Sequence, residues 1–383
     1  MSWEAYIGRR SAIWLWKEAT AGTKVSPQVW IPKESGTLNP SFETAQDTSW
    51  YGVIDEVYDT YTTKNFSNIT LTGIVREDFI GYLLLGALWK YTKLYCVTWT
   101  PSGWTPARWD ILTWNSAVLK KILVIGTTTY YFFDKSTSWS ITNGTWTMTA
   151  TAVGINAHFF ERLNSNNHPT FTLYDDDPVA SAYAPYCMIN SFELSCEVAD
   201  YVKFSAEFQW KQMQDNTDAL NPAYSDEAPF TASMAGVSFA TNESWLNNAT
   251  TVCMQNFRLT INKNLTDIQC FGSTDIDSLH NQQFTLDWDF EALFSSTTLR
   301  DWVIDSEKKA IRFYAENTNA EALVTGIYPS IYVDCMKVWL TEWTKTDDNN
   351  GITKQTLWFS GQYDNASWTS IEVLLINGNS TWY

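Results

Sequence analysis

Residues 203–211 read Lys-Phe-Ser-Ala-Glu-Phe-Gln-Trp-Lys, a stretch in which polar and apolar side chains alternate without a break. The apolar residues from Phe204 to Trp210 fall on one face of an extended strand, and the polar residues fall on the other. Stretches 257–262 and 284–291 follow the same rule. A period of two predicts either an antiparallel sheet with one solvated face or a large barrel with a wet lumen.

The composition agrees with a β-rich chain. Aromatic residues make up 16% of the 383 residues, and Trp alone occurs 21 times. Aromatic and β-branched side chains fit the pleated, half-buried surface of a sheet. We therefore expect a mainly β chain, or a β-rich α+β chain, of two or three domains. No run of 18 apolar residues occurs, so we expect no membrane insertion.

One series of strands occurs twice along the chain. Residues 171–210 contain a strand, a turn, the pair Cys187-Met188 and a long hairpin, and residues 311–360 repeat this order around Cys335-Met336. A strand, a loop, a second strand and a short apolar helix precede each passage. A repeated β-unit without catalytic residues indicates a structural building block whose units become equivalent neighbours in a closed assembly.

This duplication gives the predicted organisation of the chain. Each unit is expected to contain several strands and one short apolar helix. The long polar loop 43–64 of the first unit is expected to be functional or to form an interface, because loops of this length seldom lack a role. The predicted segments are an arm with little regular structure at 1–34, a first unit at 35–211 with an inserted Trp-rich β-subdomain at about 89–165, a connector at 212–250, and a second unit with a C-terminal strand at 251–383.

The net charge limits the functions that the chain can have. The formal charge is −17, from 42 acidic and 25 basic residues. Proteins that grip nucleic acid need Lys and Arg to replace the counterions of the phosphates, so this class is disfavoured. Two interpretations remain open: the acidic charge keeps the chain soluble, or it lines a surface past which nucleic acid slides.

The sequence contains no recognisable catalytic or metal-binding pattern. Its three His residues lack metal-ligand spacing, and no Gly-rich phosphate loop is present. None of the six Cys residues forms a C-x-x-C pair, and we expect buried free thiols rather than disulfides. We therefore expect no enzymatic activity, no cofactor and no metal.

Four stretches of the chain resemble one family of viral proteins. They are 8–23 with 35–38, the acidic and aromatic loop followed by 71–73 and a helix, 158–173 with 190–194, and 257–264 with 271–273. These stretches are similar to the tail tube, or major tail, proteins of long-tailed bacteriophages and related archaeal viruses. The Trp-rich stretch 89–165 departs from the compact pattern of this family.

The resemblance implies a fold and an assembly. Each unit of such a protein is expected to be a β-sandwich or barrel with a short flanking helix. Members of the family stack rings into a tube, and the inner strands of all subunits join into one β-barrel around a channel. Where one chain carries two units, three chains make a pseudo-hexameric ring, and the duplication described above fits that arrangement. The implied partners are further copies of the chain, the tape measure protein and a tail terminator or tip protein. The implied location is the virion tail, assembled in the host cytoplasm, with DNA as a cargo that does not adhere.

The resemblance also assigns candidate functional residues. An acidic or neutral lumen repels the DNA duplex and keeps it sliding. The candidates for the lumen are Glu193, Glu197, Glu207, Asp287, Asp289 and Glu291. The candidates for contacts between rings are Trp50, Tyr51, Asp55, Glu56, Tyr58, Tyr61, Arg9 and Arg10. The alternative for the acids is that they are ordinary solvated side chains.

The aromatic surplus leaves a second function open. Exposed Trp and Tyr side chains could stack on sugars, which would make the chain a surface or adhesion protein that binds glycans. Packing in a β-rich core and at interfaces is the interpretation that we favour for these residues.

Overall fold

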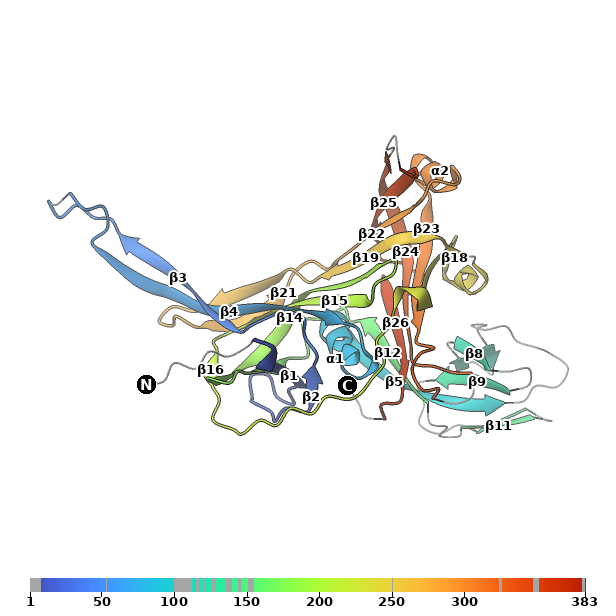
Figure 1. Ribbon diagram of the computed structural model, residues 1–383, viewed down its shortest axis with the longest axis horizontal. Coiled ribbons are helices and arrows are strands. Elements are labelled where there is room, and N and C mark those ends of the chain that lie inside the picture. The colour runs from blue at the N-terminus through green and yellow to red at the C-terminus, as the bar shows by residue number, and fades with distance from the viewer. Residues whose placement is uncertain are drawn as a thin grey trace.

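The computed structural model is elongated, with a long β-hairpin at one end and a small group of strands at the other (Figure 1). The described part of the chain contains two α-helices among many antiparallel strands, so the predicted β-rich class is confirmed. Within residues 95–154 only the backbone of the strands is described. The structure describes residues 8–380 and 383 except for 53, 100–111, 115–116, 120, 126–128, 135–139, 144–145, 151–154, 250, 324–325 and 347–350.

Four strands of the first half form a sheet in the order β3–β4–β15–β14. Their bounds are β3 Asn39–Asp47, β4 Asp59–Ile74, β14 Ser181–Glu197 and β15 Val202–Trp210. All three pairings are antiparallel. The register of β14 on β15 shifts between Ile189 and Ser191, where β14 carries a bulge. The alternation predicted for 203–211 is confirmed, because every second residue of β15 is buried.

The second half repeats this arrangement in the order β19–β22–β25–β24. Its strands are β19 Met254–Asn262, β22 Thr285–Leu293, β24 Ser330–Thr346 and β25 Lys354–Gly361. The register of β24 on β25 also shifts, between Leu340 and Glu342. Leu340 faces Phe359 as Ile189 faces Phe208, so the bulge occupies the same place in both halves.

The two four-stranded groups join through β14 and β19, which pair antiparallel from Ser191 to Glu197. The result is one continuous antiparallel sheet of eight strands, β3–β4–β15–β14–β19–β22–β25–β24. We call it the eight-stranded sheet. Over β15, β14, β19 and β22, one face of this sheet packs on the core and the other faces solvent.

A second layer ties the halves together. β17 Ala235–Ala240 pairs with β23 Lys308–Glu316, which pairs with the first part of β24. β24 also pairs with β26 Ile371–Asn377, and β26 pairs with β12 Asn156–Arg162. β12 in turn pairs with β5 Trp89–Trp99. The C-terminal strand predicted for the second unit therefore bridges to the first half.

Both ends of the predicted insertion belong to this layer. Phe159 and Phe160 of β12 are buried, and Leu94 of β5 packs in the same cluster as Phe159. The expectation of a separate β-subdomain over 89–165 is therefore too wide. The strands between them form a group at one end of the molecule (Figure 1). These strands are β6 Leu112–Trp114, β7 Ala117–Leu119, β8 Lys121–Ile125, β9 Thr129–Asp134, β10 Ser140–Asn143 and β11 Trp146–Ala150.

The segment predicted to be an arm contains a buried strand. β1 Ala12–Lys17 pairs with β13 Phe171–Asp176 and with β2 Val29–Ile31. Its residues 12–15 are buried, so the expectation of little regular structure is wrong for β1. A continuous apolar run lacks the alternation that identifies a half-buried strand, which explains the error.

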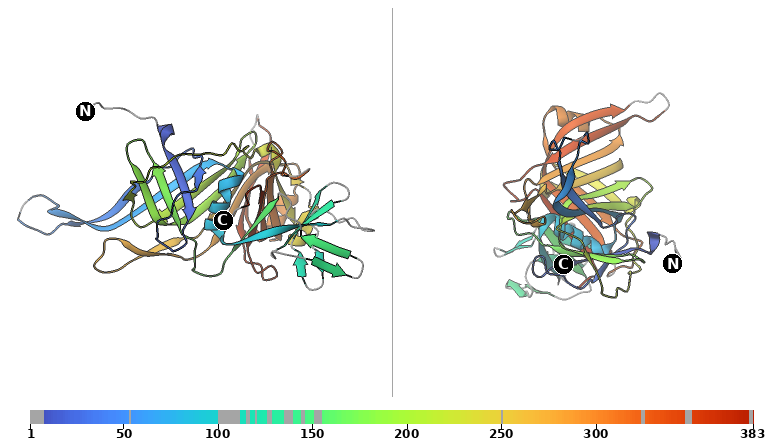
Figure 2. Two further views of the ribbon diagram at one scale, coloured as in Figure 1. Left: turned by 90° about the horizontal axis from the view of Figure 1, so that it is seen from below. Right: turned by 90° about the vertical axis from the view of Figure 1, so that its left-hand side faces the viewer.

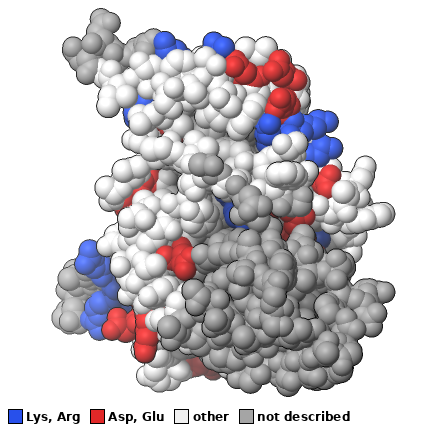
Figure 3. Space-filling view, turned by 90° about the vertical axis from the view of Figure 1, so that its right-hand side faces the viewer, with Lys and Arg blue, Asp and Glu red and all other residues white. Residues whose placement is uncertain are grey.

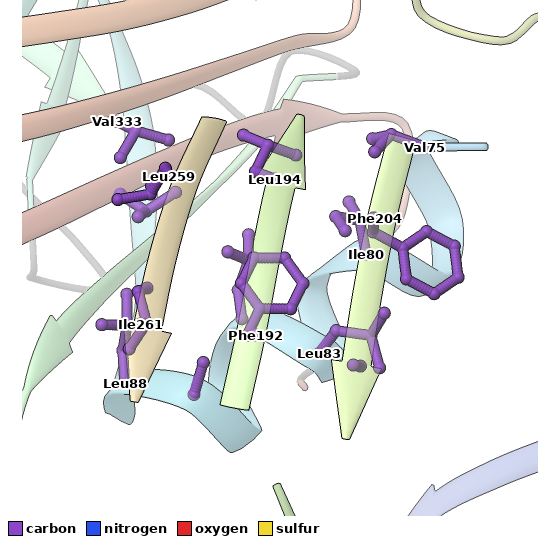
Figure 4. Close-up of a cluster of buried hydrophobic side chains, with 14 of the residues drawn as sticks. Val75, Ile80, Leu83, Leu88, Phe192, Leu194, Phe204, Leu259, Ile261 and Val333 are labelled. Carbon is purple, nitrogen blue, oxygen red and sulfur yellow. The ribbon is translucent and has the colours of Figure 1, made fainter. Parts of the chain in front are cut away.

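Helix α1 Glu77–Leu88 covers the core face of the eight-stranded sheet below the junction of the two halves. Figure 4 shows Ile80, Leu83 and Leu88 of α1 beside Phe192 of β14 and Ile261 of β19. Residues 79–88 are all buried, and Asp78 in the first turn places negative charge at the positive end of the helix dipole. The helix predicted in this region is therefore confirmed and contacts strands of both halves.

Helix α2 Thr298–Ile304 holds the matching place in the second half, between β22 and β23. It is shorter than α1, and Leu299 is its one buried residue. Ile304 at its end is 68% exposed. The helix at the outer end of the molecule thus has an apolar surface that its counterpart α1 buries.

Candidate assembly surfaces

The solvent face of the eight-stranded sheet brings the six predicted acids together. Glu193 of β14 lies directly opposite Thr260 of β19, and Thr260 lies opposite Asp287 of β22. Four residues further along β14, Glu197 begins a second row, which continues with Asn256 and Glu291 across the same three strands. Side chains that face one another across antiparallel strands lie on the same face.

The other two acids lie on this face as well. Asp289 faces Arg258 across β22 and β19, and Glu207 faces Ser191 across β15 and β14. The predicted acids therefore come from three strands of both halves and share one surface. We call this surface the acidic face.

Cations moderate the charge of the acidic face. Arg258 Nε donates to Asp289 Oδ1 at 2.8 Å, and this hydrogen bond raises the pKa of Arg258. Lys354 Nζ lies 2.6 Å from Glu291 Oε1. The acidic face thus carries ion pairs beside the remaining carboxylates. The sequence alone did not identify Arg258 and Lys354 as partners of these acids. Each cation lies on a different strand from its acid, and the pairing of those strands decides which side chains meet.

Polar groups also hold Glu207. Its Oε2 accepts hydrogen bonds from Asn190 Nδ2 and Ser191 Oγ, each at 3.1 Å. Asn190 is the bulge residue of β14, so the bulge aims an amide at the acid. Glu207 is half-buried and oriented, in contrast to a freely solvated side chain.

The end of the molecule shown in Figure 3 differs from the acidic face. Acidic and basic side chains are interspersed over the described part of that view, and most of the described surface is uncharged.

The loop predicted at 43–64 is mostly a β-hairpin. β3 and β4 pair from Asn39–Asn68 to Asp47–Asp59, and residues 48–58 form the tip. The hairpin extends well beyond the body of the molecule (Figures 1 and 2). The expectation of a loop is wrong because both faces of these strands are exposed, so no apolar alternation reveals them.

The predicted aromatic and acidic residues gather at and beside this tip. Trp50 is 101% exposed, and Tyr51, Tyr58 and Tyr61 are also exposed. Ile54 at 104% was not among the predicted residues. Asp55 and Glu56 are exposed between the aromatics. Large apolar side chains held away from a core in this way mark an interaction surface.

The tip has an ordered structure of its own. The rings of Tyr51 and Tyr58 stack with centroids 3.9 Å apart. Tyr51 Oη donates to Asp47 Oδ2 at 2.9 Å, and Ser49 N donates to Asp47 Oδ1 at 2.9 Å. Hydrogen bonds from Ser49 and Tyr51 lower the pKa of Asp47. These contacts present Trp50 on a preformed turn.

A second, shorter hairpin points the same way from the second half. β20 Leu265–Gln269 and β21 Ile276–Asn281 form it, and Phe271 at its tip is 110% exposed. It lies beside the first hairpin, since Asn65 N donates to Thr274 O at 2.7 Å (Figure 1). Each half therefore carries one hairpin with an exposed aromatic tip, and Phe271 is a residue that sequence reasoning missed.

Arg9 and Arg10 lie apart from these tips. They form a short 3-10 helix, Gly8–Arg10, that leads into β1 in the body of the molecule (Figure 1). Both are exposed, but the structure does not bring them together with Trp50 and its neighbours.

The described residues contain no group of His, Cys, Asp and Glu that could hold a metal ion. His158 Nδ1 lies 2.9 Å from Tyr91 Oη, and burial lowers the pKa of His158 to about 4. Cys187, Cys196 and Cys335 are buried free thiols, as predicted. Cys253 and Cys270 are also free thiols but are exposed, so the predicted burial is wrong for them, and the side chain of Cys96 lies outside the described residues.

Neither α-helix in the described part of the chain has the length and hydropathy of a membrane span. A duplicated β-unit with a continuous sheet, projecting hairpins and exposed end strands defines a structural protein that associates through its surfaces. The family of phage tail tube proteins matches residues 8–360, and the chain belongs to this family. It is therefore a structural component of a viral tail. A search of curated proteins gives no match.

Proposed function

We propose that the chain polymerises into stacked rings that form the tail tube, and that this tube conducts the genome during delivery. The observation that supports this most is the eight-stranded sheet. It carries one acidic face across both halves and ends in strands that could continue into neighbouring chains. Closing such a sheet into a ring would cover strand edges that an isolated chain leaves exposed.

The ring is expected to contain three chains. Each chain supplies two similar four-stranded groups, so three chains provide six equivalent groups around the channel. Homo-oligomers usually close by rotational symmetry, and the internal repeat extends that symmetry within each chain.

The acidic face is proposed to line the channel. DNA carries about one negative charge per 1.7 Å of helix axis, so a basic wall would hold it by many simultaneous contacts. Glu193 and Asp287 repel the phosphates, while pairs such as Arg258–Asp289 keep the wall close to neutral. DNA is then a cargo that slides without adhering.

The two hairpins are proposed to join successive rings. Trp50 and Ile54 at the first tip and Phe271 at the second are fully exposed in one chain. Burying such side chains against the next ring would contribute about 1.5–3 kcal/mol each. Arg9 and Arg10, placed in the body, are proposed as separate contacts at the same junction.

Further partners follow from this role. A tape measure protein would occupy the channel during assembly in the host cytoplasm, and terminator or tip proteins would close the two ends of the tube. The tape measure protein would meet the acidic face, and terminator or tip proteins would meet the surfaces that otherwise contact the next ring.

Electron microscopy of the purified protein, or of virions, tests the proposal. Stacked rings with three chains each are the expected result. A protein that stays monomeric at all concentrations and yields no tubes would contradict the proposal. Rings of six full-length chains would contradict the three-chain ring alone.

A further inference from the structure

The junction between the two halves of one chain has a defined register. β14 and β19 pair antiparallel, with Glu193 opposite Thr260 on the solvent face and Leu194 opposite Leu259 on the core face. A ring needs a similar junction between the last strand of one chain and the first strand of the next. The internal junction therefore offers a template for the contact between chains.

The bulges identify which residue of β24 corresponds to Glu193. Ile189 and Leu340 are the last residues before the register shift in β14 and in β24. Counting on from each bulge, Glu193 corresponds to Thr344. Their partners agree, since Glu193 faces Ser205 of β15 and Thr344 faces Thr356 of β25.

The pairing through β4 and β22 identifies the residue of β3 that corresponds to Thr260. Gln209 of β15 and Ser360 of β25 follow Phe208 and Phe359, the residues opposite the two bulges. Gln209 faces Asn68, and Ser360 faces Asp287. Asn68 faces Asn39, and Asp287 faces Thr260, so Asn39 corresponds to Thr260.

Both strands have an edge available for pairing. β3 pairs with β4, and among the described strands no other strand pairs with it. β24 pairs with β25 up to Thr346, whereas its pairing with β23 on the other edge ends at Trp339. Residues 39–41 of β3 and Thr344 of β24 are exposed or half-exposed.

Exposed apolar side chains accompany these edges on the core side. By the same count, Phe42 of β3 corresponds to Lys263, which follows β19. Lys263 is buried and donates to Gly86 O at the end of α1 at 2.9 Å. Phe42 is 63% exposed, and so is Ile304 at the end of α2, at 68%. A neighbouring chain placed as the internal junction dictates would bring Phe42 to the end of α2 and cover both.

Proline in β3 fits an edge that takes one specific partner. Ser35 and Thr72 exchange both backbone hydrogen bonds, and Asn39 pairs with Asn68 in the same register, so Asn39 directs its backbone groups at β4. Pro40 is therefore oriented toward the open edge, where it lacks a donor. Proline on an edge discourages pairing with arbitrary strands, at the cost of one ladder hydrogen bond.

We infer that residues 341–344 of β24 pair antiparallel with residues 39–42 of β3 in the next chain, in the register of the internal junction. Thr344 lies opposite Asn39 of the neighbouring copy, and Glu342 lies opposite Ser41. This inference rests on the proposed ring, and it specifies the residues that close it. Because Asn39 directs its backbone groups at β4, Thr344 and Asn39 form a non-hydrogen-bonded pair, with Cα atoms about 4.5 Å apart.

Disulfide trapping tests this register. Thr344→Cys and Asn39→Cys are combined in one chain whose exposed Cys253 and Cys270 are replaced by Ser. A Cα separation of about 4.5 Å permits a disulfide, so mild oxidation of assembled protein should give covalent trimers on non-reducing gels. Each single-cysteine variant in the same background should give none.

A matched variant fixes the register. Thr344→Cys with Ser41→Cys keeps both thiols on the solvent face but displaces them by two residues, to a separation of about 7–8 Å. This pair should not link. Linking of the displaced pair in preference to Asn39→Cys would overturn the register, and linking of neither pair in tubes seen by microscopy would overturn the strand pairing.

Hydrogen exchange of the unmodified protein covers the case in which the variants do not assemble. Residues 39–42 and 341–344 should gain protection when monomers form tubes, because amides on the open edges become paired. Tubes without protection in these segments would overturn the inference. Absence of tubes from the unmodified protein would instead overturn the proposed function.

Discussion

Trp50→Ser is expected to raise the concentration needed for tube growth while leaving the folded chain intact. Trp50 is 101% exposed in one chain, so its removal takes nothing from the core. In a tube, the proposed contact buries this side chain against the next ring. Full burial of a large apolar side chain stabilises by about 1.5–3 kcal/mol.

The magnitude follows from the number of contacts. Each chain that joins the tube adds one such tip, so the substitution removes about 2 kcal/mol per chain added. Since about 1.4 kcal/mol corresponds to a factor of ten, the critical concentration should rise about 30-fold. Sedimentation of tubes across a concentration series, with electron microscopy of the pellet, measures this value.

The control is Trp245→Ser, which removes another exposed Trp, 64% exposed and outside the hairpins. Its critical concentration should match that of the unmodified protein. Both variants should unfold within about 0.5 kcal/mol of the unmodified chain, because exposed side chains contribute little to stability. A Trp50→Ser chain that is folded and polymerises at the original concentration would refute the role of the tip.

Three further predictions concern charge and burial. Glu193→Lys with Asp287→Lys should make tubes retain DNA, with retention falling as salt is raised in a filter or ejection assay. Arg312→Met should destabilise the chain by about 3–5 kcal/mol in urea unfolding, because Asp334, now paired at 2.6 Å from Arg312 Nε, stays buried without its cation. Burial and then Asp78 raise the pKa of Glu77 to about 7, so its folded state holds a proton that the unfolded state releases near pH 4.5. The free energy of unfolding should therefore fall as the pH rises from about 4.5 to 7 and stay level above pH 7. Glu77→Gln should make this fall smaller by about 1–2 kcal/mol, a value reduced to allow for solvent screening of a partly exposed group.

Each of these predictions has a matched control. Asp226→Lys with Glu321→Lys makes the same charge change at exposed acids near the start of α1, and its tubes should release DNA normally. Arg312→Met with Asp334→Leu removes both members of the buried pair and should recover most of the lost stability. Asp305→Asn, at an exposed acid, should leave the pH dependence unchanged. Equal effects of test and control substitutions would contradict each explanation.

The sequence predicted the elements whose physical signal is local. Alternation in β15 identified a strand with one buried face, and the apolar run with acids at its start identified α1. The strands of the first hairpin escaped prediction because Thr, Asn and Lys side chains are exposed on both faces there. The buried β1 escaped because its apolar residues are continuous, and such a run does not distinguish a strand from other buried segments.

The residues of the candidate assembly surfaces also divide into those with a local sequence signal and those without one. The six acids could be named because each alternates with apolar residues in its own strand. Their cations could not, because Arg258 reaches Asp289 through a pairing of β19 with β22 that no local pattern specifies. Phe271 was missed for a similar reason, since its exposure depends on a hairpin that projects beside another one.

The duplication has a mechanical consequence that neither half shows alone. The junction within the chain is supported by α1, whose residues 79–88 are all buried, and by the bond from Lys263 to Gly86 O. The proposed junction between chains has the shorter α2. It also has one ladder hydrogen bond fewer, because Pro40 has no backbone N–H to donate. Three stronger and three weaker junctions would therefore alternate around a ring. A ring built in this way comes apart into whole chains, each with its acidic face formed, so the surface proposed to line the channel exists before the channel closes.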